Sequence, residues 1–104
     1  MFKEIGKRAN VIENDIGIDA DAVLNKITQE LGEFNDAVQK YRGIYCKTKT
    51  YSTEKIEEEL GDLLLNIVSL CTRIGIDPDI FPKLLETTLK KFEERKEIYK
   101  ENMS

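Results

Sequence analysis

Hydrophobic residues recur every three or four positions along most of the 104-residue chain, which is the period of an amphipathic α-helix. No sustained alternation of polar and apolar residues, bounded by hairpin turns, indicates a β-strand. A glycine follows each of the first two hydrophobic stripes, and glycine commonly ends a helix. The pattern predicts an all-α fold whose first two helices cover residues 2–16 and 20–42, with Asp19 as the N-terminal cap of the second.

Two further helices are predicted after a central loop. Ser52 is a suitable N-cap, and the hydrophobic spacing after it predicts a helix over residues 53–74. An aspartate-proline pair predicts the start of a fourth helix over residues 78–101, because proline is tolerated in a first helical turn. Pro82 lies one turn inside this start, so we expect the first turn to be irregular.

The third predicted helix is apolar around most of its circumference. The run LLLNIVSL at residues 63–70 leaves no wide face for water. Such a helix must be covered on all sides, either as the central helix of one copy or by a second copy of the chain. We therefore expect a four-helix bundle that forms a homo-oligomer, as a homodimer or a dimer of dimers, with this helix at or near the interface.

Composition narrows the class of protein. The length fits a single domain, residues 1–104. Twenty acidic and 16 basic residues give a net charge of −4, which argues against nucleic acid as the main partner. No apolar stretch is long enough to span a membrane or to form a signal peptide, so we expect a cytoplasmic protein without a membrane partner. The absence of histidine excludes Ser-His-Asp and Cys-His triads and the histidine-containing zinc and di-iron sites.

One eight-residue segment occurs twice, as KITQELGE at residues 26–33 and as KIEEELGD at residues 55–62. Five of the eight positions are identical, and the eighth is a carboxylate in both copies. Each copy places two acids three residues apart, on one face of a helix. A short connection makes the two helices antiparallel, so we expect the four carboxylates to face one another. These carboxylates belong to Glu30, Glu33, Glu59 and Asp62.

Converging carboxylates repel one another, and without a cation some would be protonated at neutral pH. Mg²⁺ or Mn²⁺ would relieve this repulsion, because both prefer oxygen ligands and complete their shells with water and phosphate oxygens. Gly32 and Gly61 each cost about 1 kcal/mol inside a helix, so we expect close helix approach or room for a ligand to offset them. The alternative is a solvated acidic face, paired with Lys26 and Lys55 one turn earlier.

These residues resemble the ExxE...ExxD signature of the MazG-like nucleoside triphosphate pyrophosphohydrolases, an all-α group related to dimeric dUTPases and phosphoribosyl-ATP pyrophosphatases. The most specific string is EELGDLLL at residues 58–65, and the likeness extends from about Leu24 to Arg95. The resemblance implies Mg²⁺-dependent hydrolysis of a (deoxy)nucleoside triphosphate between its α and β phosphates, which yields a monophosphate and pyrophosphate. It also implies that the metal ligands are Glu30, Glu33, Glu59 and Asp62.

The same resemblance assigns two basic residues. Lys91 and Arg95 match the KFxxR segment of the family and are expected to contact the triphosphate. Two positions depart from the family pattern: Gln29 replaces a common glutamate before the first ExxE, and Leu89 replaces an asparagine often found before KFxxR. The second departure puts the identity of the nucleotide in doubt.

The remaining expectations concern proton transfer and substrate contact. Because the chain has no histidine, we expect a carboxylate to accept the proton of the attacking water, either Glu33 or Glu30. Asn66, one turn after Asp62, is a candidate for orienting a ligand or contacting substrate. Two other classes of protein fit the same residues: a module that binds metal and nucleotide without turnover, and a structural helical oligomer.

Overall fold

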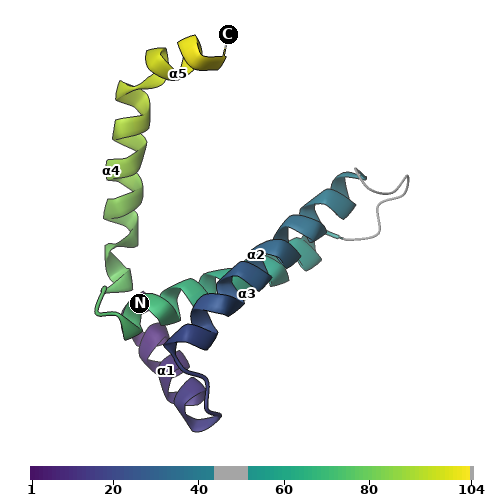
Figure 1. Ribbon diagram of the computed structural model, residues 1–104, viewed down its shortest axis with the longest axis vertical. Helices are drawn as coiled ribbons and strands as arrows, with labels where there is room; N and C mark the ends of the chain where they lie inside the picture. The colour runs from purple at the N-terminus through teal and green to yellow at the C-terminus, as the bar shows by residue number, and fades with distance from the viewer. Residues whose placement is uncertain (44–51, 104) are drawn as a thin grey trace.

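The computed structural model describes residues 1–43 and 52–103, and every regular element in these ranges is helical (Figure 1). The elements are α1 (Phe2–Asp15), α2 (Ala20–Arg42), α3 (Thr53–Arg73), the 3₁₀ helix η1 (Pro78–Ile80), α4 (Phe81–Glu94) and α5 (Lys96–Met103). The prediction of an all-α fold is confirmed, and the first three helices agree with their predicted ranges to within a residue. None of the helices described is both long and apolar enough to cross a lipid bilayer.

The fourth predicted helix is wrong in its extent, because the helix breaks at Arg95 between α4 and α5. The described chain therefore has five α-helices, not four. The rings of Phe92 and Tyr99 stack across the break with centroids 5.1 Å apart. In a straight helix these positions would be about 10 Å apart along the axis, so the bend allows the stacking. The irregular first turn expected before Pro82 is confirmed, as the 3₁₀ helix η1.

Side-chain hydrogen bonds fix where α2 and α3 begin. Asp19 Oδ1 accepts a hydrogen bond from the backbone N–H of Ala22 at 2.9 Å, and Ser52 Oγ accepts one from Lys55 N–H at 3.3 Å. Both predicted N-caps are thus confirmed. Gly43 ends α2 with a φ of 73°, a backbone conformation that glycine adopts without steric cost.

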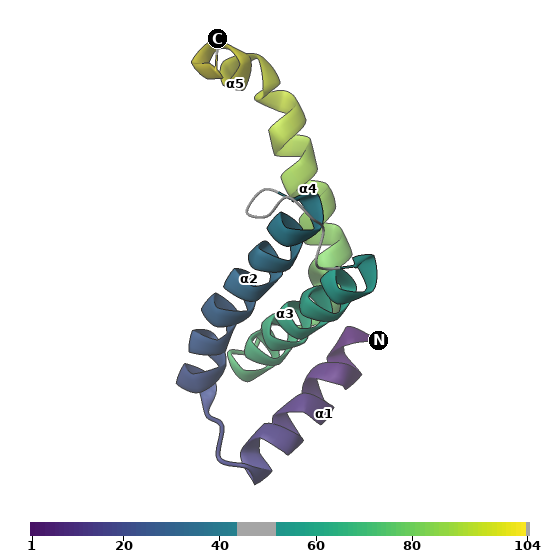
Figure 2. The ribbon, with the colours of Figure 1, turned by 90° about the vertical axis from the view of Figure 1, so that its right-hand side faces the viewer.

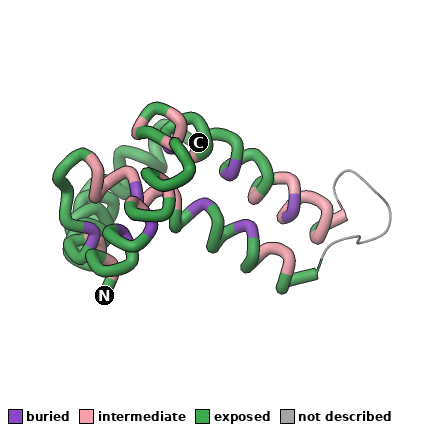
Figure 3. Tube along the Cα trace, turned by 90° about the horizontal axis from the view of Figure 1, so that it is seen from below, coloured by how far each residue is buried: buried purple, intermediate pink, exposed green. Residues whose placement is uncertain are grey.

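The central element is α3, with α2 antiparallel to it on one side and α1 on another (Figure 2). Helices α1 and α3 approach closely at Gly6, where a Cβ atom would overlap Thr72 Oγ1. Buried residues lie in these three helices and in η1 (Figure 3). Among the residues that the structure describes, few hydrophobic side chains are buried: Ala9, Val23, Ala37, Leu63 and Val68.

A largely buried polar cluster holds α1 against the C-terminal half of α3. Glu13 accepts a hydrogen bond from Ser69 Oγ at 2.6 Å and pairs with Arg73 at 3.0 Å. Arg73 also donates to the backbone carbonyl of Ile18 at 3.1 Å, just before α2. Because buried charges are costly unless they are paired, this cluster fixes the position of α1 and of the turn that follows it.

Helices α4 and α5 form an arm that extends away from the other helices (Figure 1). The root of the arm is held by Asp79 in η1, which accepts a hydrogen bond from Phe2 N–H at 2.7 Å, and by Phe81, whose ring centroid lies 6.0 Å from that of Phe2. No residue of α4 or α5 is buried. Within one copy, the packed unit is therefore three helices and not the expected bundle of four.

Candidate metal site

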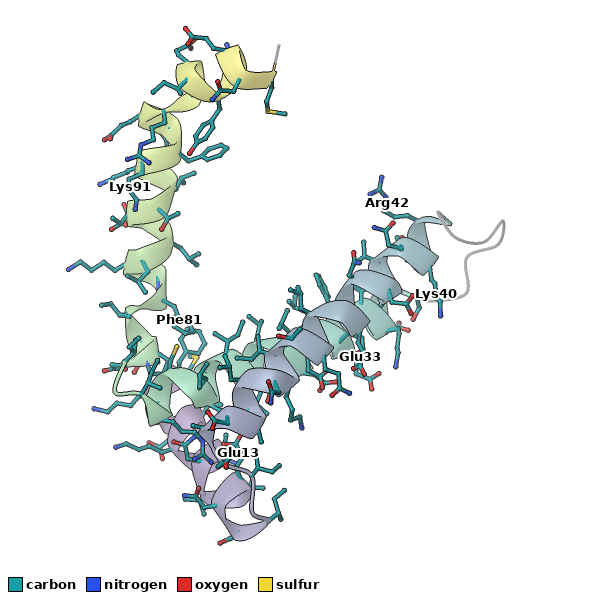
Figure 4. The ribbon with its side chains drawn as sticks, in the orientation of Figure 1. Glu13, Glu33, Lys40, Arg42, Phe81 and Lys91 are labelled. Carbon is teal, nitrogen blue, oxygen red and sulfur yellow. The ribbon has the colours of Figure 1, made fainter. Side chains whose placement is uncertain are left out.

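Three carboxylates meet between α2 and α3. Glu30, Glu33 and Glu59 each offer an oxygen within 4.8 Å of the other two. Glu30 and Glu59 are only 9% and 8% exposed, whereas Glu33 is exposed at the edge of the helix pair. Figure 4 shows Glu33 on the side of the helix pair that is turned away from the arm. The structure thus brings together three of the four residues that the repeated segment singled out.

Asp62, the fourth residue, lies outside this group. Its side chain is exposed, but its charge contributes to the raised pKa of Glu30. The backbone carbonyl of Asp62 accepts a hydrogen bond from Asn66 Nδ2 at 2.8 Å, so the Asn66 side chain folds back along its own helix. The amide keeps its second N–H and its Oδ1 atom, so this bond by itself does not prevent contact between Asn66 and a substrate.

Burial and like charge set the electrostatics of the cluster. Desolvation raises the pKa of Glu30, and the hydrogen bond with Glu33 and the negative charges of the neighbouring acids raise it further. The Oε2 atoms of Glu30 and Glu59 are both buried without a hydrogen-bond partner. Unpartnered buried oxygens are costly, and a hard divalent cation satisfies several carboxylates at once. The donor set therefore fits Mg²⁺ or Mn²⁺.

The alternative expectation is that a lysine one turn earlier pairs with an acid of each copy of the repeated segment. It holds for Lys55 but not for Lys26. Lys55 Nζ lies 3.0 Å from Glu59 Oε1. No salt bridge joins Lys26 to Glu30 among the residues described. Because Lys55 engages Oε1, the buried Oε2 of Glu59 is the oxygen left for a cation. On the other helix, Gln29 Nε2 donates to Glu33 Oε1 at 3.3 Å, so the residue that departs from the family pattern contacts the cluster.

The two glycines of the repeated segment do not serve helix packing within one copy. A Cβ atom at Gly32 or Gly61 would meet no described atom within 4 Å. The expectation of close helix approach is therefore wrong here, because both positions face outward from the helix pair. The open space beside Gly32 belongs to a groove of about 560 Å³ that is lined by Thr28, Leu31, Gly32, Phe34, Asn35 and Val38.

The two basic candidates are separated from the carboxylates of the same copy. Lys91 lies on α4, and Figure 4 places it on the arm, well away from Glu33 on α2. Arg95 lies at the break between α4 and α5, still further along the arm. One copy of the chain therefore does not assemble the cations and the carboxylates into one site.

The fold and the site define a class of protein, an all-helical domain with a candidate divalent-cation site between two antiparallel helices. The chain belongs to the MazG nucleotide pyrophosphohydrolase domain family, whose model matches residues 18–99. This match covers α2, α3, α4 and the start of α5, and it includes the three clustered carboxylates. No curated protein and no solved structure matches the chain.

Proposed function

We propose that this chain is a Mg²⁺-dependent nucleoside triphosphate pyrophosphohydrolase that converts a (deoxy)nucleoside triphosphate to a monophosphate and pyrophosphate. Membership of the MazG family supports the class of reaction. The observation that carries the metal assignment is the pair of buried, unpartnered oxygens on Glu30 and Glu59. We expect Mn²⁺ to substitute, because it has the same preference for oxygen ligands.

Glu30, Glu33 and Glu59 would hold the cation, and Asp62 would join them by rotation of its exposed side chain. When bound, Mg²⁺ neutralises phosphate charge and makes water more acidic. Lys55 holds one oxygen of Glu59 and so determines which oxygen faces the cluster.

Glu33 is the proposed proton acceptor, because it is the exposed member of the cluster and is open to solvent water. Water attacks the α-phosphorus, the bond from this atom to the bridging oxygen breaks, and pyrophosphate leaves while the carboxylate takes the proton. Glu30 is the alternative acceptor, although its burial restricts access to water. Gln29 would orient Glu33 through their hydrogen bond.

Lys91 and Arg95 are proposed to bind the β and γ phosphates, which carry most of the negative charge of the substrate. Asn66 would contact the substrate through the second N–H or the Oδ1 atom of its amide, while its first N–H holds the carbonyl of Asp62. Because the arm carries both cations away from the carboxylates of its own copy, their proposed role needs a homo-oligomer, either a homodimer or a dimer of dimers.

The reaction is tested by incubating the protein with Mg²⁺ and each of a panel of canonical and damaged nucleoside triphosphates. We expect equal amounts of monophosphate and pyrophosphate from at least one substrate. Glu59→Gln, which removes a charge but keeps the shape, should lower kcat/KM by about 100-fold or more. The control is Asp36→Asn on α2, an acid paired with Lys40 at 3.1 Å outside the cluster, which should leave the rate unchanged.

Release of orthophosphate, or no product from any substrate, would contradict the proposed reaction. If the protein bound Mg²⁺ and a nucleotide without forming product, the binding-module alternative would be favoured. If it bound neither, the structural alternative would be.

A further inference from the structure

Each copy of the repeated segment begins with a lysine, Lys26 on α2 and Lys55 on α3. Each lysine precedes a clustered glutamate by four residues, so the two side chains lie one helical turn apart on the same face. Helices α2 and α3 are antiparallel, and Glu30 lies level with Glu59 (Figure 2). The two lysines therefore lie one turn from the cluster in opposite directions, and they bracket the carboxylates along the helix pair.

The ion pairs of Lys55 show that a lysine at this position reaches the cluster. Its Nζ atom lies 3.0 Å from Glu59 Oε1 and 3.9 Å from Glu58 Oε2. The Lys55 side chain is 39% exposed and that of Glu59 is 10% exposed, so the ammonium group lies between the buried carboxylate and solvent. On α2, the exposed Lys26 precedes the exposed Glu33 by seven residues, about two helical turns, and shares its face. The open edge of the cluster therefore has a lysine on each helix.

The charge of the cluster explains why cations are needed beside it. The three clustered carboxylates outweigh the positive charge of one Mg²⁺, so the site stays negative when the metal is bound. A triphosphate is itself an anion, and like charges repel strongly where water is partly excluded. Lys91 and Arg95 lie on the arm, away from the carboxylates of the same copy. Lys26 and Lys55 supply two positive charges at the cluster itself.

We infer that Lys26 and Lys55 are substrate-binding residues, which hold the triphosphate along the α2–α3 pair through its non-bridging oxygens. This inference rests on the proposed function. An ammonium group has three N–H donors on a flexible stem, so Lys55 can keep its contact with Glu59 and also donate to a phosphate oxygen. Lys55 thereby links a metal ligand to the substrate within one copy of the chain.

The position of the two lysines assigns them to the α-phosphate and its immediate neighbour. Both lie one turn from the carboxylates beside which the α-phosphorus is attacked, whereas the β and γ phosphates are assigned to Lys91 and Arg95. Charge-assisted hydrogen bonds from ammonium groups stabilise the charge that develops on phosphate oxygens during the displacement. In the opposite case, the two lysines only balance acids on a wet surface, a contact that contributes little free energy.

The inference is tested with inorganic triphosphate and Mn²⁺, a probe that requires neither turnover nor a nucleobase. Isothermal titration calorimetry measures the affinity of triphosphate for the Mn²⁺-loaded protein, and electron paramagnetic resonance measures that of Mn²⁺ alone. Lys26→Met and Lys55→Met remove the charge but keep an unbranched side chain, and each should weaken triphosphate binding by about 10-fold or more. Mn²⁺ alone should bind at least as tightly as to the wild type, because a nearby positive charge has been removed.

Lys7→Met is the matched control, because it makes the same change of charge away from the cluster. Lys7 is exposed on α1 and lines one hollow with Thr72, which lies about 20 Å along α3 from Glu59. This variant should bind Mn²⁺ and triphosphate as the wild type does. Lys55→Arg keeps the charge and should retain most of the affinity for triphosphate. None of the substituted lysines is buried, so the helices of each variant should persist, which far-ultraviolet circular dichroism checks.

Unchanged triphosphate affinity in both methionine variants would overturn the inference. So would a parallel loss of Mn²⁺ and triphosphate affinity in Lys55→Met, because Lys55 would then only hold Glu59 in place for the metal. Hydrolysis by the wild type with an unchanged kcat/KM in both variants would overturn it too and leave the proposed function standing. A wild-type protein that hydrolyses no nucleotide would instead contradict the proposed function, and weaker triphosphate binding by the two variants would still support the inference.

Discussion

Glu59 is as buried as the neighbouring Leu63, although it carries a carboxylate. Proteins rarely bury a carboxylate fully unless its charge has a partner. Glu59 has Lys55 on one oxygen and no hydrogen-bond partner on the other, and Glu30 likewise has one unpartnered oxygen. A divalent cation would satisfy both residues at once. In the proposed function, Glu30 and Glu59 therefore hold the cation, and the exposed Glu33 accepts the proton.

Asp79 is a second carboxylate whose surroundings lead to a prediction, one of pH dependence. Desolvation raises the pKa of Asp79, but hydrogen bonds from Phe2 N–H, the amino group of Met1 and Lys3 N–H outweigh this effect and lower the pKa overall. A depressed pKa means that ionised Asp79 stabilises the fold above the ordinary aspartate pKa of about 4 and loses this effect as the pH falls through the folded value.

We expect Asp79→Asn to lower the Tm at pH 7, and the difference from the wild type to shrink as the pH falls below about 4. Thermal unfolding followed by circular dichroism between pH 7 and pH 2 measures this difference. An equal difference at both ends of this range would contradict the prediction, because the variant would then act through shape and not through charge.

Three residues of the candidate metal site could be predicted because their pattern is local. The spacing of the repeated segment identified Glu30, Glu33 and Glu59, and the structure brings them together. The cluster of Glu13, Ser69 and Arg73 could not be predicted, because its members lie 56 to 60 residues apart and no local pattern links them.

At the scale of helices, the hydrophobic period and the capping residues were sufficient to place α1, α2 and α3. The break at Arg95 could not be predicted, because the residues around it favour helix. The stacking of Phe92 on Tyr99 that accompanies the break joins two positions that a straight helix would hold about 10 Å apart. The packing of α1 on α3 depends on Gly6, where a Cβ atom would meet Thr72. This role could not be predicted either, because no local pattern links Gly6 to Thr72.

Alanine substitutions at two helical glycines should therefore have opposite effects. Gly6→Ala forces a Cβ atom against Thr72, a β-branched residue with little freedom, and should lower the free energy of unfolding by about 1–2 kcal/mol. Gly61→Ala adds a Cβ atom in open space and should raise it by up to about 1 kcal/mol through helix propensity.

Urea unfolding measures both variants at one fixed protein concentration, since self-association would make the measured stability depend on concentration. A neutral Gly6→Ala would contradict the close approach of α1 and α3. A destabilising Gly61→Ala would show that the outer face of α3 is covered at this position.

At the scale of the whole molecule, one copy exposes 7979 Å², whereas a compact monomer of 12.0 kDa exposes about 6,000 Å². The sequence indicated that α3 must be covered on all sides, from its run of apolar residues, but it could not indicate which element provides the cover. In one copy, α1 and α2 cover two sides and leave Leu60 and Leu64 exposed. The described helices of one copy therefore do not form the expected four-helix bundle.

The central claim is that the clustered carboxylates bind a divalent cation, and it is tested most directly by titrating Mn²⁺ and following its electron paramagnetic resonance signal. The wild-type protein should bind Mn²⁺ and release it to excess Mg²⁺. Glu30→Gln and Glu59→Gln should each weaken binding by about 10-fold or more, and Asp36→Asn should not. Equal binding of Mn²⁺ by all four proteins, or binding by none, would contradict the account.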